Sequence, residues 1–180
     1  MIFIRKLILL TLIIFSFSNH AMAIEHVSVQ INSPAPYFNL TGFSSQLNQK
    51  NSWNLNDFKN SWLVLYFYPK DFTKGCTIEA KGFADISKKL IKKDVRIVGI
   101  SNDSSIDHES FCEKEDLDLL LLSDEEGKAS KAYDSWNYPL SKRNTFLIDP
   151  KGLVRYKWVG VNPSTHPKDV LNYLTKELEV

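Results

Sequence analysis

The feature that constrains this chain most is an apolar, aromatic segment that leads into a polar loop and then a helical pattern, over residues 66–79. The apolar segment ends at Pro69, and the loop carries Gly75 immediately before Cys76. A helical pattern begins at about this cysteine. The stretch therefore predicts a core strand, a tight loop and a helix start. It also places a thiol where unpaired backbone N–H groups and the positive end of the helix dipole gather.

Apolar runs and amphipathic segments alternate through the chain. The apolar runs at 61–69 and 95–100 are typical of strands covered on both faces, and the period of residues 77–93 indicates a helix. The N-terminal region 24–55 is irregular, with edge-strand pieces predicted at 37–40 and 53–55. After the second apolar run we predict a weak helix at 106–116, a strand at 117–122, and a helix that a capping box opens at Ser123 and that runs to about Tyr133. A loop at 137–140, strands at 145–148 and 153–159, and a last helix with Pro167 in its first turn complete the chain. This alternation predicts a three-layer α/β fold with a mixed sheet.

The first residues have the pattern of an export signal. Arg5 and Lys6 form a basic start, residues 7–17 are almost entirely apolar, and residues 21–23 (Ala-Met-Ala) fit the small-x-small cleavage pattern. The apolar run is shorter than the about 20 residues that span a membrane. We expect cleavage after residues 1–23 and one mature domain over 24–180, exported to a bacterial periplasm without stable membrane association. An uncleaved N-terminal anchor is the alternative.

Charge and motif content argue against several function classes. The 22 Lys and Arg residues nearly balance the 21 Asp and Glu residues, so the chain lacks the basic footprint of a nucleic-acid binder. It also has no Gly-rich phosphate loop and no nucleophile elbow. The histidines are scattered without ligand spacing, and we expect His26, His108 and His166 to lie on the surface. We predict no metal and no cofactor.

A thiol at a helix start needs more than a lowered pKa to be an efficient nucleophile. A free thiol with a pKa of about 8.5 is about 3% thiolate at pH 7, and a pKa of about 6 raises that fraction roughly 30-fold. Intrinsic nucleophilicity falls about 10-fold over the same change, so the two effects nearly cancel. The site must therefore also orient the electrophile and stabilise charge on the leaving group.

Several groups around the loop suit these tasks. The hydroxyl of Thr73 lies three residues before the cysteine, Pro69 can shield the sulfur from water, and the loop N–H groups can donate to an oxygen. A guanidinium would complete such a pocket. Arg143, which precedes a predicted strand, is one source, and Arg96 and Arg155 are others that the sequence pattern does not exclude.

Both cysteines, Cys76 and Cys112, lie in the predicted mature chain. In an exported protein two cysteines can form one disulfide, so a non-catalytic domain with a structural disulfide remains open. A domain of this size does not usually need such a disulfide. A thioredoxin-like oxidoreductase would need Cys-x-x-Cys after the strand, whereas this chain has Glu79 at the second cysteine's position.

The loop also matches a known signature. The pattern Pro69-x-x-x-Thr73-x-x-Cys76 resembles the active-site signature of the peroxiredoxins. Its flanking residues, Phe-Tyr-Pro-Lys-Asp before it and Gly-Cys-Thr-x-Glu around the cysteine, resemble the bacterioferritin-comigratory, or PrxQ, branch. The similarity continues in family order through residues 98–104, 121–124 and 143–149, and it extends from about residue 34 to the C-terminus.

This resemblance implies a thioredoxin-like fold and a thiol peroxidase that reduces hydrogen peroxide and organic hydroperoxides. Cys76 would be the peroxidatic cysteine, which becomes a sulfenic acid. Thr73 and Arg143 would bind and polarise the peroxide, and Pro69 would shield the sulfur. Glu79 would pair with the arginine, although an ordinary first-turn glutamate is the alternative. The expected partners are a peroxide and a thioredoxin-like dithiol reductant, and the expected state is a monomer or weak dimer.

The chain departs from many PrxQ proteins at one position. These proteins have a second cysteine five residues after the first, where this chain has Lys81. A subset places the resolving cysteine in the following helix, and Cys112 fits that position. The resemblance therefore implies an intramolecular disulfide between Cys76 and Cys112, with local unwinding if the reduced thiols lie too far apart. A one-cysteine peroxidase, with Cys112 a bystander, is the alternative.

Overall fold

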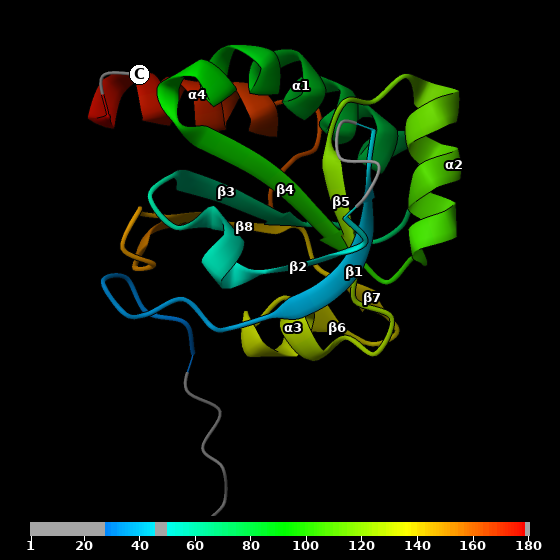
Figure 1. The fold of residues 1–180 in the computed structure, drawn as a ribbon, viewed down its shortest axis with the longest axis horizontal. Coiled ribbons are helices and arrows are strands. Elements are labelled where there is room, and N and C mark those ends of the chain that lie inside the picture. Colours follow the sequence, from blue (N-terminus) through cyan, green and yellow to red (C-terminus); the bar gives the residue numbers. More distant parts are fainter. Residues whose placement is uncertain (1–27, 46–49, 179–180) are drawn as a thin grey trace, which may run out of the picture.

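The computed structural model describes residues 28–45 and 50–178. At its centre lies a seven-stranded mixed sheet in the order β2-β1-β5-β4-β3-β8-β9 (Figure 1). Its strands are β1 Asn39–Ser44, β2 Ser52–Asn54, β3 Trp62–Phe67, β4 Val95–Ser101, β5 Leu120–Ser123, β8 Asn144–Ile148 and β9 Val154–Val159. The pairs β3–β4 and β4–β5 are parallel, and the other neighbours are antiparallel. The predicted α/β fold with a mixed sheet is confirmed.

Helices cover both faces of this sheet (Figure 1). The helices are α1 Lys74–Leu90, α2 Ser105–Glu115, α3 Lys128–Ala132 and α4 His166–Glu177, with 3-10 turns η1 Leu55–Phe58 and η2 Ile91–Lys93. Helices α1 and α4 lie together on one face, and α2 lies at the flank beside β1 and β5. Helix α3 lies on the other face with a small hairpin of β6 Trp136–Asn137 and β7 Leu140–Ser141. No helix within the described ranges is long and apolar enough to cross a bilayer.

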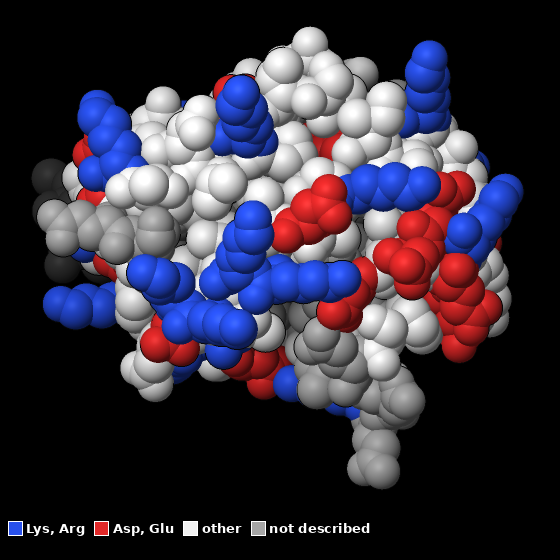
Figure 2. All heavy atoms as spheres, turned by 90° about the horizontal axis from the view of Figure 1, so that it is seen from above, with Lys and Arg blue, Asp and Glu red and all other residues white. Residues whose placement is uncertain are grey.

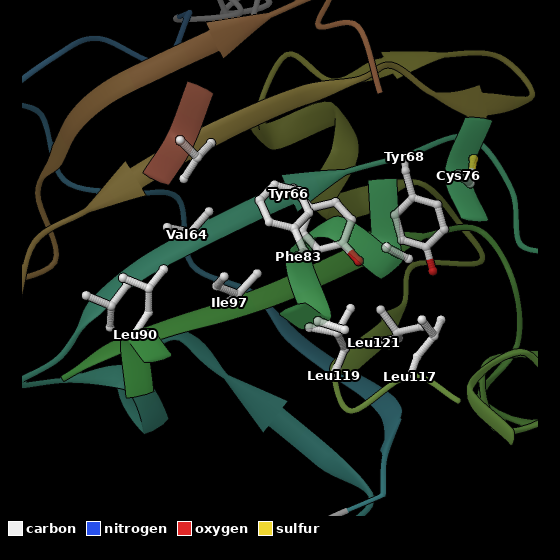
Figure 3. Packing of buried hydrophobic residues seen from close by; sticks show 14 of the residues in the cluster. Val64, Tyr66, Tyr68, Cys76, Phe83, Leu90, Ile97, Leu117, Leu119 and Leu121 are labelled. Carbon is white, nitrogen blue, oxygen red and sulfur yellow. The ribbon is translucent and has the colours of Figure 1, made fainter. Parts of the chain in front are cut away.

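The central strand β3 shows why the core has two layers. Val64 and Tyr66 belong to the cluster under α1 and α4, which Figure 3 shows. Leu63, Leu65 and Phe67 belong to the cluster on the opposite face. Successive strand residues point to opposite faces, so a strand covered on both sides must be apolar throughout. This is the physical reason that the continuous apolar run at 61–69 predicted a central strand.

The surface over the α1–α4 layer matches the near-neutral composition. Figure 2 looks onto this layer and shows separate groups of basic and acidic side chains rather than one continuous basic face. The four lysines at the end of α1 and in η2 are exposed: Lys88, Lys89, Lys92 and Lys93. They form a solvated end of the helix, where positive charge also complements the helix dipole.

The predicted capping box at Ser123 is wrong. Ser123 is the last residue of β5 and pairs with Thr41 and Ser101 in the sheet. The N-cap residue of the helix is Gly127, and the carboxylate of Asp124, three residues before it, accepts hydrogen bonds from the N–H groups of Ala129 and Ser130 at 3.0 and 2.7 Å. Helix α3 therefore begins at Lys128 and is shorter than predicted, because the chain first makes a turn that this carboxylate holds.

Two other expectations need correction, and one falls outside the described ranges. The piece predicted at 37–40 contributes to β1, which is not an edge strand because it lies between β2 and β5. The predicted loop at 137–140 contributes to both strands of the β6–β7 hairpin. Residues 1–27, which carry the predicted export signal and His26, lie outside the described ranges.

Candidate active site

Cys76 lies in the first turn of α1, directly beyond the C-terminal end of β3. The helix begins at Lys74, earlier than the period of its apolar residues predicted, and Thr73 is its N-cap. The first helical bond runs from the N–H of Thr77 to the carbonyl of Thr73, at 2.9 Å. The Cys76 side chain is only 1% exposed. A thiol at this point is close to the unpaired N–H groups and positive dipole end of the helix, which favour an anion.

Arg143 connects the thiol to a buried carboxylate. It lies one residue before β8 and comes from a part of the sequence far from the loop. Its Nη2 donates to the Cys76 sulfur at 3.3 Å, and its Nη1 donates to Glu79 Oε2 at 2.8 Å. Glu79 is one helical turn after the cysteine and is 1% exposed. The guanidinium therefore holds a positive charge and a hydrogen-bond donor at the sulfur, and the carboxylate holds the guanidinium.

The other two candidate arginines are engaged elsewhere. Arg96 donates from Nη1 to the carbonyl of Ile91, at 3.2 Å. Arg155 pairs with Asp149, its Nε lying 2.7 Å from Oδ2. Of the three arginines that the sequence pattern left open, Arg143 is therefore the one whose guanidinium lies at the Cys76 sulfur.

The glycine before the cysteine leaves room for this guanidinium. A Cβ on Gly75 would lie 2.9 Å from Arg143 Nη2 and 3.3 Å from Pro163 Cγ. Such contacts are shorter than ordinary van der Waals separation, so any larger residue would displace the arginine or the loop that carries Pro163. The small residue beside Cys76 is thus a requirement of the site and not only of the turn.

Thr73 and Pro69 frame the loop in different ways. The Thr73 hydroxyl is exposed and donates to the Lys70 carbonyl at 3.0 Å, so in this structure it does not bond the sulfur. Its oxygen keeps acceptor capacity that a bound ligand can use. Pro69 is half-buried and opens the loop after β3.

The prediction that His166 lies on the surface is wrong. His166 is the first residue of α4, is fully buried, and has Nδ1 2.9 Å from Glu79 Oε1. One buried carboxylate is therefore held by both Arg143 and His166. The signal for its burial was present in the sequence: His166, Val170 and Leu174 recur every four residues on the buried stripe of the last helix.

Comparison with known proteins identifies the family. The profile of the AhpC/TSA family matches residues 31–157. Peroxiredoxin Bcp of Bacillus subtilis is 36% identical over 156 residues, which cover 82% of this chain and 96% of the relative. The chain is a peroxiredoxin of the bacterioferritin-comigratory, or PrxQ, branch. Peroxiredoxin Bcp of Escherichia coli is also 36% identical, over 129 residues, which cover 67% of this chain and 83% of that relative.

Solved peroxiredoxin structures confirm the thioredoxin-like fold. A cysteine-to-serine mutant of PrxQ from Xylella fastidiosa has a TM-score of 0.72 and 28% identity, covering 84% of this chain and 99% of its own. A cysteine-to-serine mutant of peroxiredoxin Q from Xanthomonas campestris has a TM-score of 0.67 and 33% identity, covering 70% and 85%. As a member of this family, the protein is a thiol peroxidase with oxidoreductase activity.

A second buried network joins the loop of this peroxiredoxin to α2. His108 was predicted to be a surface residue, which is wrong, because it is fully buried with Nδ1 2.7 Å from Asp71 Oδ2. The Tyr68 hydroxyl donates to the other carboxylate oxygen at 2.7 Å, and the Asp71 N–H donates to Asp103 Oδ2 at 2.9 Å. Burial raises the pKa of Tyr68 well above its usual range, so the phenol remains a donor. The sequence analysis assigned no role to Asp71, because two of its partners, Asp103 and His108, come from other segments of the chain.

Cys112 lies on the buried face of α2, in the same apolar cluster as Cys76, and both cysteines are free thiols. Burial, together with the negative charges of Asp71 and Asp118, raises the pKa of the Cys112 thiol to about 12. In this structure Cys112 is therefore a protonated, shielded thiol. Lys81, five residues after Cys76, pairs with Glu115 at 2.7 Å and connects α1 to α2.

This raised pKa predicts a pH-dependent loss of stability. The Cys112 pKa rises from an ordinary 9.0 to about 12 on folding, so the unfolded chain releases the thiol proton first. Its contribution to stability is complete below about pH 9 and is lost as the pH rises toward about 12. Between about pH 8 and 10.5, we expect the wild type to lose about 1–2 kcal/mol more unfolding free energy than Cys112→Ser. Urea unfolding at both pH values measures this, and equal losses in the two proteins would contradict it.

Proposed function

We propose that this protein is an exported peroxidase in which Cys76 attacks a peroxide. The thiolate sulfur attacks the nearer oxygen of the O–O bond, and the other oxygen leaves as an alcohol or as water after taking up a proton. Cys76 is oxidised to the sulfenic acid and the peroxide is reduced. The observation that carries this assignment is the Arg143 Nη2 donor 3.3 Å from a buried sulfur in the first turn of a helix.

The other loop residues have distinct proposed roles. Arg143 stabilises the thiolate and then the charge that develops on the peroxide oxygens, which is the kind of electrostatic stabilisation that dominates many enzymes. Thr73 is exposed, lies three residues before Cys76, and orients the peroxide through its hydroxyl oxygen. Pro69 limits access of water at the start of the loop. Glu79 holds the arginine, from which its oxygen is 2.8 Å away.

Hydrogen peroxide and organic hydroperoxides are the proposed substrates. A solved Xanthomonas campestris bacterioferritin comigratory protein, 32% identical to this chain, is described by its alkyl peroxide reduction activity. The exposed aromatic ring of Phe72 in the loop, next to Thr73, supports a site that accepts an alkyl group. We therefore propose that both substrate types react at Cys76.

Cys112 is the proposed resolving residue. Its sulfur attacks the Cys76 sulfur, the sulfenic oxygen leaves as water with the thiol proton, and an intramolecular disulfide forms. Burial raises the pKa of the Cys112 thiol to about 12, so almost none of it is thiolate near neutral pH, and we propose that α2 opens before the attack. The helix suits this change: it has 11 residues and the apolar side chain of Ile106 is 74% exposed on it. The cost of opening includes breaking the 2.7 Å contact between His108 and Asp71.

A thioredoxin-like dithiol protein is the proposed reductant of this disulfide. The signal pattern of residues 1–23 supports cleavage near Ala23 and export to a bacterial periplasm, with no stable membrane association afterwards. Regeneration then depends on an exported dithiol protein, because an oxidising compartment supplies no general pool of reducing thiols. A monomer or weak dimer is the proposed state.

Mass analysis under non-reducing conditions tests the assignment. After one equivalent of peroxide, the reduced protein should lose two hydrogen atoms and show one peptide pair linked through Cys76 and Cys112. Cys112→Ser should instead hold a sulfenic acid that dimedone traps, and it should turn over poorly with a thioredoxin-type reductant. A protein that consumes no peroxide would refute the peroxidase role. Wild-type turnover by Cys112→Ser would establish a one-cysteine mechanism, and a secreted protein retaining Met1 would refute signal cleavage.

A further inference from the structure

The Glu79 carboxylate is shared between two partners from different parts of the chain. Arg143 Nη1 donates to Oε2 at 2.8 Å, and His166 Nδ1 lies 2.9 Å from Oε1. Glu79 is 1% exposed and His166 is fully buried, so water does not compete for either oxygen. Each carboxylate oxygen therefore has one fixed donor.

This sharing determines how the guanidinium is oriented. An arginine and a carboxylate commonly pair through two parallel bonds, with two guanidinium nitrogens on the two oxygens. Here only one nitrogen of Arg143 is used in this way, because His166 occupies the second oxygen. The other nitrogen, Nη2, is left to donate to the Cys76 sulfur at 3.3 Å.

His166 is itself held firmly. Its ring packs edge-on against Phe83, with centroids 5.1 Å apart, and against Trp158 at 6.1 Å. The next residue, Pro167, packs against Gly82 of α1, and a Cβ on Gly82 would lie only 2.6 Å from Pro167 Cγ. The start of α4 is thus fixed against α1, and the imidazole has little freedom to leave the carboxylate.

We propose that His166 is a positioning residue of the peroxidase site. By occupying Oε1 of Glu79, it limits the Arg143–Glu79 pair to one hydrogen bond. The second guanidinium nitrogen is then directed to Cys76. Without His166, Arg143 forms two hydrogen bonds with the Glu79 carboxylate, and its Nη2 no longer donates to the sulfur. The inference rests on the proposed roles of Cys76 and Arg143.

This role does not depend on the charge of the imidazole. An ionised carboxylate only accepts hydrogen bonds, so Nδ1 must carry the proton in the contact with Glu79, whether the ring is neutral or charged. The other ring nitrogen, Nε2, is buried without a hydrogen-bond partner among the described residues. His166 therefore contributes through the single donor that faces Oε1.

The test measures the first chemical step alone. Variants are made in a Cys112→Ser background, so that Cys76 is the only thiol. The reduced proteins are mixed with hydrogen peroxide over a range of pH, and the sulfenic acid is quantified by dimedone labelling and mass analysis. His166→Phe keeps a ring among the aromatic neighbours but removes the donor. His166→Asn keeps a side-chain N–H near the position of Nδ1.

We expect the Phe variant to react about 10- to 100-fold more slowly, since a charge-assisted donor to the sulfur is lost. Its pH–rate profile should move to higher pH, because the thiolate is less stabilised. The Asn variant should stay close to the parent in rate and profile. Tyr173→Phe, which changes a side chain of α4 that packs against Tyr156 and Trp158 and not against His166, is the matched control and should keep the parent rate and profile.

Several outcomes would overturn the proposal. These are an unchanged rate in a folded Phe variant, or equal losses in the Phe and Asn variants at matched melting temperatures. If the Phe variant does not fold, His166→Gln replaces it, because the glutamine amide lies near the Nε2 position and leaves no donor at the Nδ1 position. A Gln variant that reacts as fast as the parent would also overturn the proposal. If the parent itself forms no sulfenic acid, the proposed function fails instead, which separates the two ideas.

Discussion

Replacing Cys76 with serine should lower peroxide consumption by at least about 1,000-fold, because the reaction loses its nucleophile. A serine hydroxyl at the same place has no comparable tendency to ionise and cannot pass through a sulfenic acid. Arg143 and Glu79 would remain, but they can only hold a peroxide that has nothing to attack it. Peroxide loss, followed with a dithiol reductant in excess, measures the effect.

Cys112→Ser is the matched control for this prediction, because it removes the other thiol and leaves the first step intact. With enzyme in excess over peroxide and no reductant, it should consume all of the added peroxide at about the wild-type rate. Cys76→Ser should consume none. Activity in Cys76→Ser equal to the wild type would mean that the sulfur is not the nucleophile, and it would end the proposed mechanism.

Changing Arg143 to lysine should slow the first step by about 100-fold, the loss seen when one preorganised donor is removed from a charged site. Lysine keeps the charge but offers a single ammonium on a flexible stem. That group cannot bond Glu79 and the Cys76 sulfur at the positions now held by Nη1 and Nη2, 2.8 and 3.3 Å away. The rate of sulfenic acid formation in a Cys112→Ser background measures the loss.

Removing the charge as well should also affect stability. In Arg143→Met, the buried Glu79 would lose the guanidinium that pairs with it, and removing one member of a buried pair costs about 3–5 kcal/mol in other proteins. Because the Arg143 side chain is 20% exposed, we expect a smaller cost of about 1–3 kcal/mol in urea unfolding.

Arg155→Lys is the control, since Arg155 also pairs with a carboxylate, Asp149 at 2.7 Å, but is not bonded to the cysteine. It should keep the wild-type rate. A normal rate in Arg143→Lys, or an equal loss in Arg155→Lys, would contradict the role of Arg143.

The order of strands and helices could be read from the chain because it depends on local patterns. The apolar run of β3 and the helical period of α1 each report which faces are buried, and burial follows a period of two or 3.6 residues. The same reasoning placed Cys76 at a helix start. It failed at Ser123, where a sheet pairing decided by distant residues overrode a local capping pattern.

What the sequence determined by itself was the strand, loop and helix around Cys76, and hence the place of the thiol. The tertiary structure alone decided its surroundings. It brought Arg143, 67 positions away, to the sulfur and His166, 87 positions away, to Glu79. It also buried His108 against Asp71. Hydrogen bonds between distant segments leave no periodic trace in a sequence, because they depend on how helices and strands pack and not on which residues are neighbours along the chain.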